Sequence, residues 1–326
     1  MKNDILETVL LLALPASGKS EVRRYLKHLP PKACRDEFHM GPTVQLDDFP
    51  FVHLMRRIDD ELERRGRPRA FFKAGDSPFI DPRDWGTLIH LVNEDHADLV
   101  ARKRHSPSSA ARFVFARLES AAAKAGLPPR LAKLDAKIVT GTAEALEKEC
   151  AEWLREKNDN IPDSLDGKTI VIEFARGGPD GSPMPLKPPF GYAYSLSQLS
   201  PAILEKAAIL YVWVTPEESR RKNQARTDPD DPGSILHHGV PLEVMMNDYG
   251  CDDMDWLESR SKAKGAVTVE GSGRTFVIPV GRFDNRKDKT SFLRADPKDW
   301  AAADVKAVSE GLKGALDRLA SAGAAR

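Results

Sequence analysis

The chain lacks the features of several protein classes. Its 326 residues include only three cysteines, which lie far apart and show no metal-ligand spacing (Cys34, Cys150 and Cys251). A disulfide framework is therefore not expected, and the thiols are expected to be reduced, as in a cytoplasmic protein. The first apolar run ends after about eight residues, which is too short to span a bilayer, and no small-residue cleavage site follows it. We expect a cytoplasmic protein with no membrane partner.

The chain also lacks net charge. Lysine plus arginine and aspartate plus glutamate both number 49. No overall positive field attracts nucleic acid, so we do not expect a nucleic-acid partner. The composition is that of a globular protein, with 41% hydrophobic and 30% charged residues. Nothing in it indicates the oligomeric state.

Short apolar segments alternate with amphipathic ones along much of the chain. Segments typical of buried strands lie at residues 8–13, 43–46, 168–174, 208–214 and 275–280. Helical patterns lie at residues 19–29, 51–65, 216–226 and 300–319. This alternation predicts an α/β fold with a roughly five-stranded parallel sheet.

One long stretch carries no strand signal. Apolar residues recur at helical spacing in residues 88–102, 109–125 and 130–157. We therefore predict an α/β core made of residues 1–85 and 165–326, interrupted by a helical insertion, or cap, at residues 86–164.

A glycine-lysine-serine loop follows the first predicted strand and precedes a predicted helix. Gly18, Lys19 and Ser20 match the phosphate-binding P-loop pattern, and Ala13 replaces its first glycine. In such a loop backbone N–H groups and the lysine bind phosphates, and the hydroxyl binds Mg²⁺. The loop predicts ATP binding, with GTP as an alternative, although Gly-Lys-Ser can also occur by chance in a strand-turn-helix. The predicted nucleotide-binding residues are Ala13, Pro15, Ala16, Ser17, Gly18, Lys19, Ser20, Glu21, Arg226 and Asn285.

The segment from Leu14 to Ser20 resembles the P-loop of nucleoside, nucleotide and small-molecule kinases, zeta-toxin-like kinases included. An acidic pair ends the second predicted strand, an arginine-bearing helix follows the strand at 208–214, and Asn285 follows the last strand, where such kinases often contact the base. The resemblance covers the α/β parts, about half to two-thirds of the chain. It implies the three-layer P-loop NTPase fold and a kinase that transfers the γ-phosphoryl of Mg-ATP to a hydroxyl of a small molecule. It does not identify that acceptor.

Carboxylates at strand ends are the candidate catalytic and metal-binding groups, because ligands of parallel sheets bind beyond these ends. By the resemblance, Asp47 or Asp48 accepts the proton of the attacking hydroxyl; the alternative is an Asx turn or a helix N-cap. Glu173 either binds Mg²⁺ or pairs with Arg176, which otherwise contacts substrate. Which of the three carboxylates is the base stays open. The predicted metal ligands are Ser20, Asp47 and Glu173. Lys19, Arg176 and Arg220 complete the predicted catalytic set.

The charged helix at residues 216–226 has two interpretations. By the resemblance it begins a lid whose arginines, Arg220 and Arg226 among them, close onto the phosphates. The polar segment from Thr227 to Pro232 would be the lid tip, and His237 and His238 would line it. Alternatively, the helix is a solvated face with Glu–Arg pairs.

Two further features leave alternatives open. Tyr192 and Tyr194 follow a Pro/Gly-rich loop, where they stack on a planar substrate or, as we favour, anchor the loop. The function itself has two alternatives to a kinase: a P-loop NTPase that hydrolyses ATP or GTP, and a regulatory protein that binds nucleotide without catalysis. Against the first, no strand ends in an apolar run plus Asp-Glu.

Overall fold

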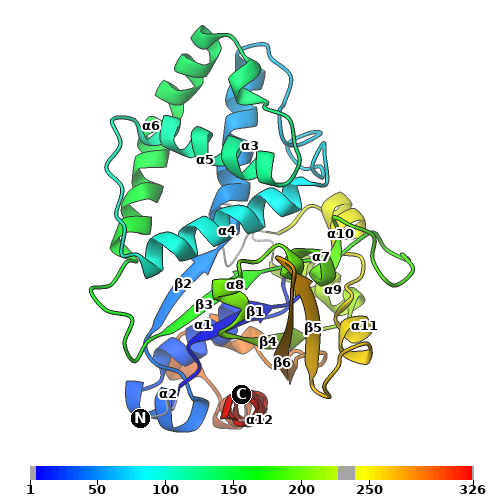
Figure 1. Ribbon diagram of the computed structural model, residues 1–326. Helices are drawn as coiled ribbons and strands as arrows, with labels where there is room; N and C mark the ends of the chain where they lie inside the picture. Colours follow the sequence, from blue (N-terminus) through cyan, green and yellow to red (C-terminus); the bar gives the residue numbers. More distant parts are fainter. Residues whose placement is uncertain (1–4, 227–238, 325–326) are drawn as a thin grey trace.

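A six-stranded sheet forms the centre of the molecule (Figure 1), whose computed structural model describes residues 5–226 and 239–324. The strand order is β2-β3-β1-β4-β6-β5, and every neighbouring pair except β5 and β6 is parallel. The strands are β1 (Thr8–Leu12), β2 (Thr43–Asp47), β3 (Thr169–Phe174), β4 (Ala207–Trp213), β5 (Ala266–Gly271) and β6 (Arg274–Asp284). The predicted α/β class is confirmed, but the antiparallel edge strand β5 is an addition to the predicted sheet.

Side chains that alternate along the central strands divide the core into two layers. Leu10 and Leu12 of β1 belong to one apolar cluster, and Val9 and Leu11 to the other. The first cluster is covered by α4 (Asp84–Val100), α7 (Gly191–Ser197), α8 (Pro201–Leu204) and α11 (Met254–Ser259). The second is covered by α1 (Lys19–His28), α2 (Pro31–Phe38) and α12 (Ala302–Ala324). The sheet therefore lies between two layers of helices.

The predicted helical stretch forms a group of helices at the β2 side of the sheet (Figure 1). It contains α4, α5 (Ala110–Lys124), the short turn η1 (Leu131–Lys133) and α6 (Ala136–Asp159). Helix α6 begins at Ala136 and not at residue 130, because the η1 turn is followed by Leu134 and Asp135, whose ψ angles of 154° and 137° are not helical. Helix α3 (Phe49–Arg64) shares one apolar cluster with α4, α5 and α6.

Helix α4 connects this group to the sheet. Ile89 and Val92 of α4 pack in the cluster on the sheet, whereas Leu88 and Leu91 pack in the cluster of the helical group. Both pairs are fully buried, which matches the nearly all-round apolar character of this helix. The helical group is thus held against the edge of the sheet by a shared core.

Several short helices between the strands are not predicted by the sequence pattern, namely α2, α7, α8, α10 (Leu242–Asp248) and α11. Tyr192 and Tyr194 lie on α7; the former is fully buried and the latter packs against Gly86 of α4, as expected of anchoring residues. The expected lid tip at Thr227–Pro232 and the histidines His237 and His238 lie outside the described residues. No helix of the described ranges is both long and apolar enough to cross a bilayer.

Candidate active site

A cavity of about 870 Å³ extends over the ends of β1, β2 and β3 and also between α1 and the sheet, where Val9, Leu11, Val22 and Leu26 line it. One part is lined by residues 15–20, by the acidic ends of β2 and β3, and by Arg226. Another part is lined by residues of α3 and by residues 72–85 and 240–249. We call it the acceptor half, after the role that is proposed for it under the function. The cavity thus lies at the junction of the sheet and the helical group.

The Ala13–Ser20 loop connects β1 to α1 at the floor of this cavity. Ala16 and Gly18 have positive φ angles, 52° and 105°, which turn successive backbone N–H groups of a loop toward one side. The Nζ atom of Lys19 lies inside the turn, 3.3 Å from the carbonyl oxygen of Ala13 and 3.4 Å from that of Leu14. The buried hydroxyl of Ser17 has no hydrogen-bond partner within the described residues. A polar ligand at this loop would supply one.

The loop is held from outside by two other elements. Asn285, just after β6, donates from Nδ2 to the carbonyl oxygen of Ser17 at 2.6 Å. Ser219 of α9 (Pro216–Arg226) donates from Oγ to the carbonyl oxygen of Pro15 at 2.7 Å. A Cβ atom at Gly18 would clash with Thr290 Oγ1 and come within 2.8 Å of Asn285 Nδ2. A side chain at this position would therefore displace the hydrogen bond from Asn285 to the loop. The conformation of the loop is therefore set by tertiary contacts as well as by its own sequence.

Two carboxylates lie opposite each other at the ends of β2 and β3. Asp47 and Glu173 are register partners on these parallel strands, and both line the cavity with Ser20. Arg23 of α1 pairs with Glu173 at 2.6 Å and approaches Asp47 at 3.8 Å. Burial, together with the charges of Glu173 and Asp48, raises the pKa of Asp47 to about 7. This arrangement favours a bound proton or a cation at Asp47.

Asp48 has a different partner from its neighbour. Its Oδ2 atom lies 2.6 Å from Nη1 of Arg176, and both side chains are buried. Burial raises the pKa of Asp48, whereas the Arg176 charge and then the Lys19 charge oppose that increase. The guanidinium of Arg176 is oriented by Ser195 Oγ at 3.1 Å and lies 4.8 Å above the Trp85 ring. These contacts hold the Asp48 carboxylate in one orientation at the cavity wall.

Helix α9 presents its charged residues in different directions. Arg226 lines the cavity, and Lys222 is buried one turn before it, where it pairs with Asp288 at 2.7 Å. Arg220 lies 3.7 Å from Asp180 and 3.6 Å from Glu217 and does not line the cavity. Only part of the predicted arginine set is therefore directed at the site.

Ten of the fifteen predicted site residues line the cavity, and the other five do not. The residues that line it are Pro15, Ala16, Ser17, Gly18, Lys19, Ser20, Asp47, Asp48, Glu173 and Arg226. Those outside its lining are Ala13, Glu21, Arg176, Arg220 and Asn285. Of these, Glu21 is buried and accepts a hydrogen bond from Arg294 at 2.7 Å, and Asn285 supports the loop.

Other cavity residues were not predicted from the sequence. Arg23 of α1 pairs with Glu173, whereas Arg176, the partner considered as one alternative for Glu173, pairs with Asp48. The unpredicted residues of the acceptor half include Arg56, Phe72, Phe79, Trp85, Asp248 and Tyr249. They come from three segments far apart in the chain, and no local pattern links them.

Comparison with known proteins does not identify the chain: no protein-family model matches it, and neither the curated proteins nor the solved structures contain a match.

Proposed function

We propose that the chain is a P-loop kinase that transfers the γ-phosphoryl group of Mg-ATP to a hydroxyl group of a small molecule. One observation carries the proposal: Lys19, Ser20 and the carboxylates that end β2 and β3 line the same cavity. This is the combination that phosphoryl transfer requires, since phosphate-binding donors, a metal ligand and a proton acceptor must lie together.

The Ala13–Ser20 loop is the phosphate site in this proposal. Its backbone N–H groups and the α1 N-terminus bind phosphate oxygens, and Lys19 neutralises the outer phosphates. Burial lowers the pKa of Lys19, and the charges of Glu173, Asp47 and Asp48 act in the opposite direction. A bound polyphosphate adds negative charge next to the buried ammonium, so it holds Lys19 in its protonated form.

The residues present fit Mg²⁺. Ser20, Asp47 and Glu173 offer the hard oxygen ligands that this ion prefers. The pKa of Asp47 is raised by burial and then by the charges of Glu173 and Asp48, and a divalent cation would relieve that repulsion. No group of three His, Cys, Asp or Glu side chains that could hold a metal occurs in residues 5–226 and 239–324. Mg²⁺ at a P-loop needs fewer protein ligands, because phosphate oxygens and water complete its shell. When bound, it neutralises the charge of the β- and γ-phosphates.

Asp48 is the proton acceptor that we assign. In the transfer, the acceptor oxygen forms a bond to the γ-phosphorus while the bond from that phosphorus to the β–γ bridging oxygen breaks. The hydroxyl proton passes to the carboxylate of Asp48, and ADP leaves with the bridging oxygen. Arg176 acts as a positioning residue, because it holds Asp48 without lining the cavity.

A Lys19→Ala variant tests the proposal. We expect it to lose most of its affinity for Mg-ATP, about a hundredfold or more, because the backbone of the loop alone does not replace the ammonium charge. Isothermal titration calorimetry measures the effect. Lys32→Ala is the matched control, because Lys32 is an exposed lysine on α2. Equal ATP affinity of both variants and the unmodified chain would contradict the proposal. ADP release without any acceptor would favour a hydrolase.

A further inference from the structure

The acceptor half of the cavity has a continuous aromatic wall, which we define as Phe72, Phe79, Trp85 and Tyr249. Phe72 and Phe79 stack with ring centroids 4.5 Å apart, Phe79 meets Trp85 edge-on at 5.0 Å, and Trp85 meets Tyr249 edge-on at 5.5 Å. All four residues line the cavity, although each is less than one-tenth exposed, and Val52, Val240 and Val244 add aliphatic surface. Such a surface binds flat or apolar groups.

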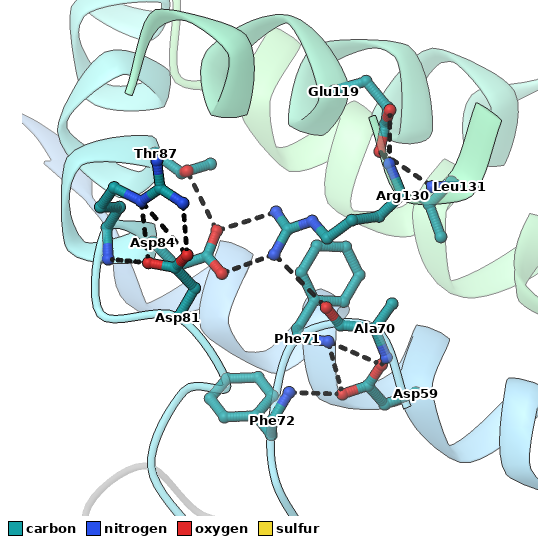
Figure 2. Close-up of polar contacts among 11 residues, drawn as sticks. Asp59, Ala70, Phe71, Phe72, Asp81, Asp84, Thr87, Glu119, Arg130 and Leu131 are labelled. Atoms are coloured by element: carbon teal, nitrogen blue, oxygen red, sulfur yellow. Dashed lines mark hydrogen bonds and ion pairs between the residues drawn. The ribbon is translucent and has the colours of Figure 1, made fainter. Parts of the chain in front are cut away.

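The backbone that carries two of these rings is fixed by a buried carboxylate. Asp59 of α3 has no exposed surface and accepts hydrogen bonds from the backbone N–H groups of Ala70 at 2.6 Å and Phe72 at 2.8 Å (Figure 2). Phe71 N–H also points to this carboxylate, at 3.2 Å. Farther along, Phe72 and Phe79 form an antiparallel bridge. The ring positions are thus set by the helical group and not by the loop alone.

A second buried charge holds the other end of the same segment. Arg130 makes a two-pronged ion pair with Asp84, the residue before Trp85, at 2.6 and 2.8 Å (Figure 2). Its guanidinium also donates to the carbonyl oxygen of Ala70 at 3.4 Å and lies 4.4 Å over the Phe71 ring. Residues 70–85 are therefore anchored at both ends, which is typical of a preorganised binding surface.

The charges of the acceptor half do not suit an acceptor that carries a phosphate. Arg56 is the one cation among the described residues that line this half. Its guanidinium lies 4.0 Å over the Phe72 ring and donates to the carbonyl oxygens of Gly75 and Ser77. A phosphate is usually bound by several N–H donors from arginine or lysine, and the donors of Arg56 are already directed at the backbone.

Two carboxylates face the same space. Asp48 is the proposed proton acceptor, and Asp248 of α10 is buried, lines the cavity and lies near the Trp85 side chain. Both carboxyl groups can accept hydrogen bonds from hydroxyl and amine groups, and neither supplies the N–H donors that bind a phosphate. The polar groups of this half therefore favour donors on the acceptor molecule.

We propose that the acceptor is an unphosphorylated, uncharged or cationic molecule with a flat or apolar body, which packs on the aromatic wall and presents a hydroxyl to Asp48. This inference rests on the kinase function proposed above and adds the chemical class of the acceptor. Asp248 binds a second hydroxyl or an amine of the same molecule.

The experiment uses the full chain, Mg²⁺ and ATP labelled with ³²P at the γ-position. The probe is a small-molecule cell extract passed over an anion-exchange resin, which separates neutral and cationic molecules from anionic ones. We expect label to move into a product of the neutral and cationic fraction. Transfer into the anionic fraction at an equal or higher rate would overturn the acceptor class but leave the kinase function intact. Transfer to neither fraction would contradict the kinase function itself, and this inference would fall with it.

Variants of the wall then test the binding mode on the acceptor isolated from the active fraction. Phe72→Ala and Phe79→Ala should raise the KM for the acceptor by about tenfold and leave the KM for ATP unchanged. Ile80→Ala is the control, because Ile80 adjoins Phe79 but is 48% exposed and does not line the cavity. Phe→Leu changes at the same positions keep the apolar volume if an alanine variant does not fold. An increased KM for ATP, or no change in either constant, would overturn the assignment.

Discussion

At the scale of single residues, Asp47 and Asp48 show how adjacent carboxylates acquire separate environments. Asp47 ends β2 and accepts a hydrogen bond from the Phe49 N–H at 2.8 Å, which is the Asx-turn alternative considered for it. Asp48 occupies the N-cap position of α3, but its side chain makes no cap hydrogen bond and pairs with Arg176 instead. The pair could be located from the sequence because it ends an apolar strand, but the sequence did not indicate which carboxylate had which partner.

The two positions should respond differently to substitution. Asp48→Asn should lower kcat by about a hundredfold or more with ATP affinity retained, because an amide does not accept the hydroxyl proton. Asp47→Asn should instead raise the Mg²⁺ concentration needed for half-maximal activity. Steady-state kinetics at several Mg²⁺ concentrations, with the identified acceptor, distinguish the two effects. If Asp48→Asn keeps full kcat, the base lies elsewhere, with Glu173 the next candidate.

At the scale of elements, the segment of residues 70–85 depends on a helix that precedes it in the chain. Asp59→Asn should lower the free energy of unfolding by about 2 kcal/mol. The carboxylate offers two acceptor oxygens to the buried N–H groups, whereas the amide of the variant offers only one. Urea denaturation measures the change. Asp60→Asn is the control, since Asp60 is partly exposed and pairs with Arg69 at 3.0 Å; it should cost less than about 1 kcal/mol. Equal effects would mean that Asp59 does not anchor the segment.

The elements that could be predicted are those with a local signal. Continuous apolar runs located β1, β3 and β4, and Gly18-Lys19-Ser20 marked the loop between β1 and α1. Strand β5 alternates buried Val267 and Val269 with more exposed residues, as an edge strand does, and so lacks such a run. Short helices such as α10 are stabilised by tertiary packing and not by their own sequence pattern.

At the scale of the whole molecule, the cavity joins parts of the chain that are distant in the sequence. The part of the cavity that we propose binds phosphate comes from residues 15–20 and from strand ends, which the order of a parallel sheet brings together. The acceptor half depends on how the helical group packs against β2 and α10. That packing is specified by many apolar contacts at once, which explains why Trp85, Asp248 and Tyr249 were not found by inspection of the sequence.

Burial of acidic groups at this junction should make the stability of the whole molecule depend on pH. Burial raises the pKa of Asp248 to about 7, above its ordinary value of 3.8. The folded chain therefore binds this proton more tightly than the unfolded chain, and the stabilising effect of protonation is lost as the pH rises through about 7. Ionisation of the Asp248 carboxyl between pH 6 and pH 8 should by itself lower the free energy of unfolding by about 1 kcal/mol.

An Asp248→Asn variant isolates that contribution, because other titrating groups, such as His96 with a pKa lowered to about 4 by burial, are common to both proteins. Urea denaturation at pH 6 and pH 8 should show a smaller loss of stability in the variant than in the unmodified chain, by about 1 kcal/mol. Asp255→Asn provides a comparison, because Asp255 is exposed and pairs with Arg282 at the surface. If the unmodified chain and Asp248→Asn show the same pH dependence, the Asp248 carboxyl titrates at its ordinary pKa. Its burial against Trp85 would then not persist in solution.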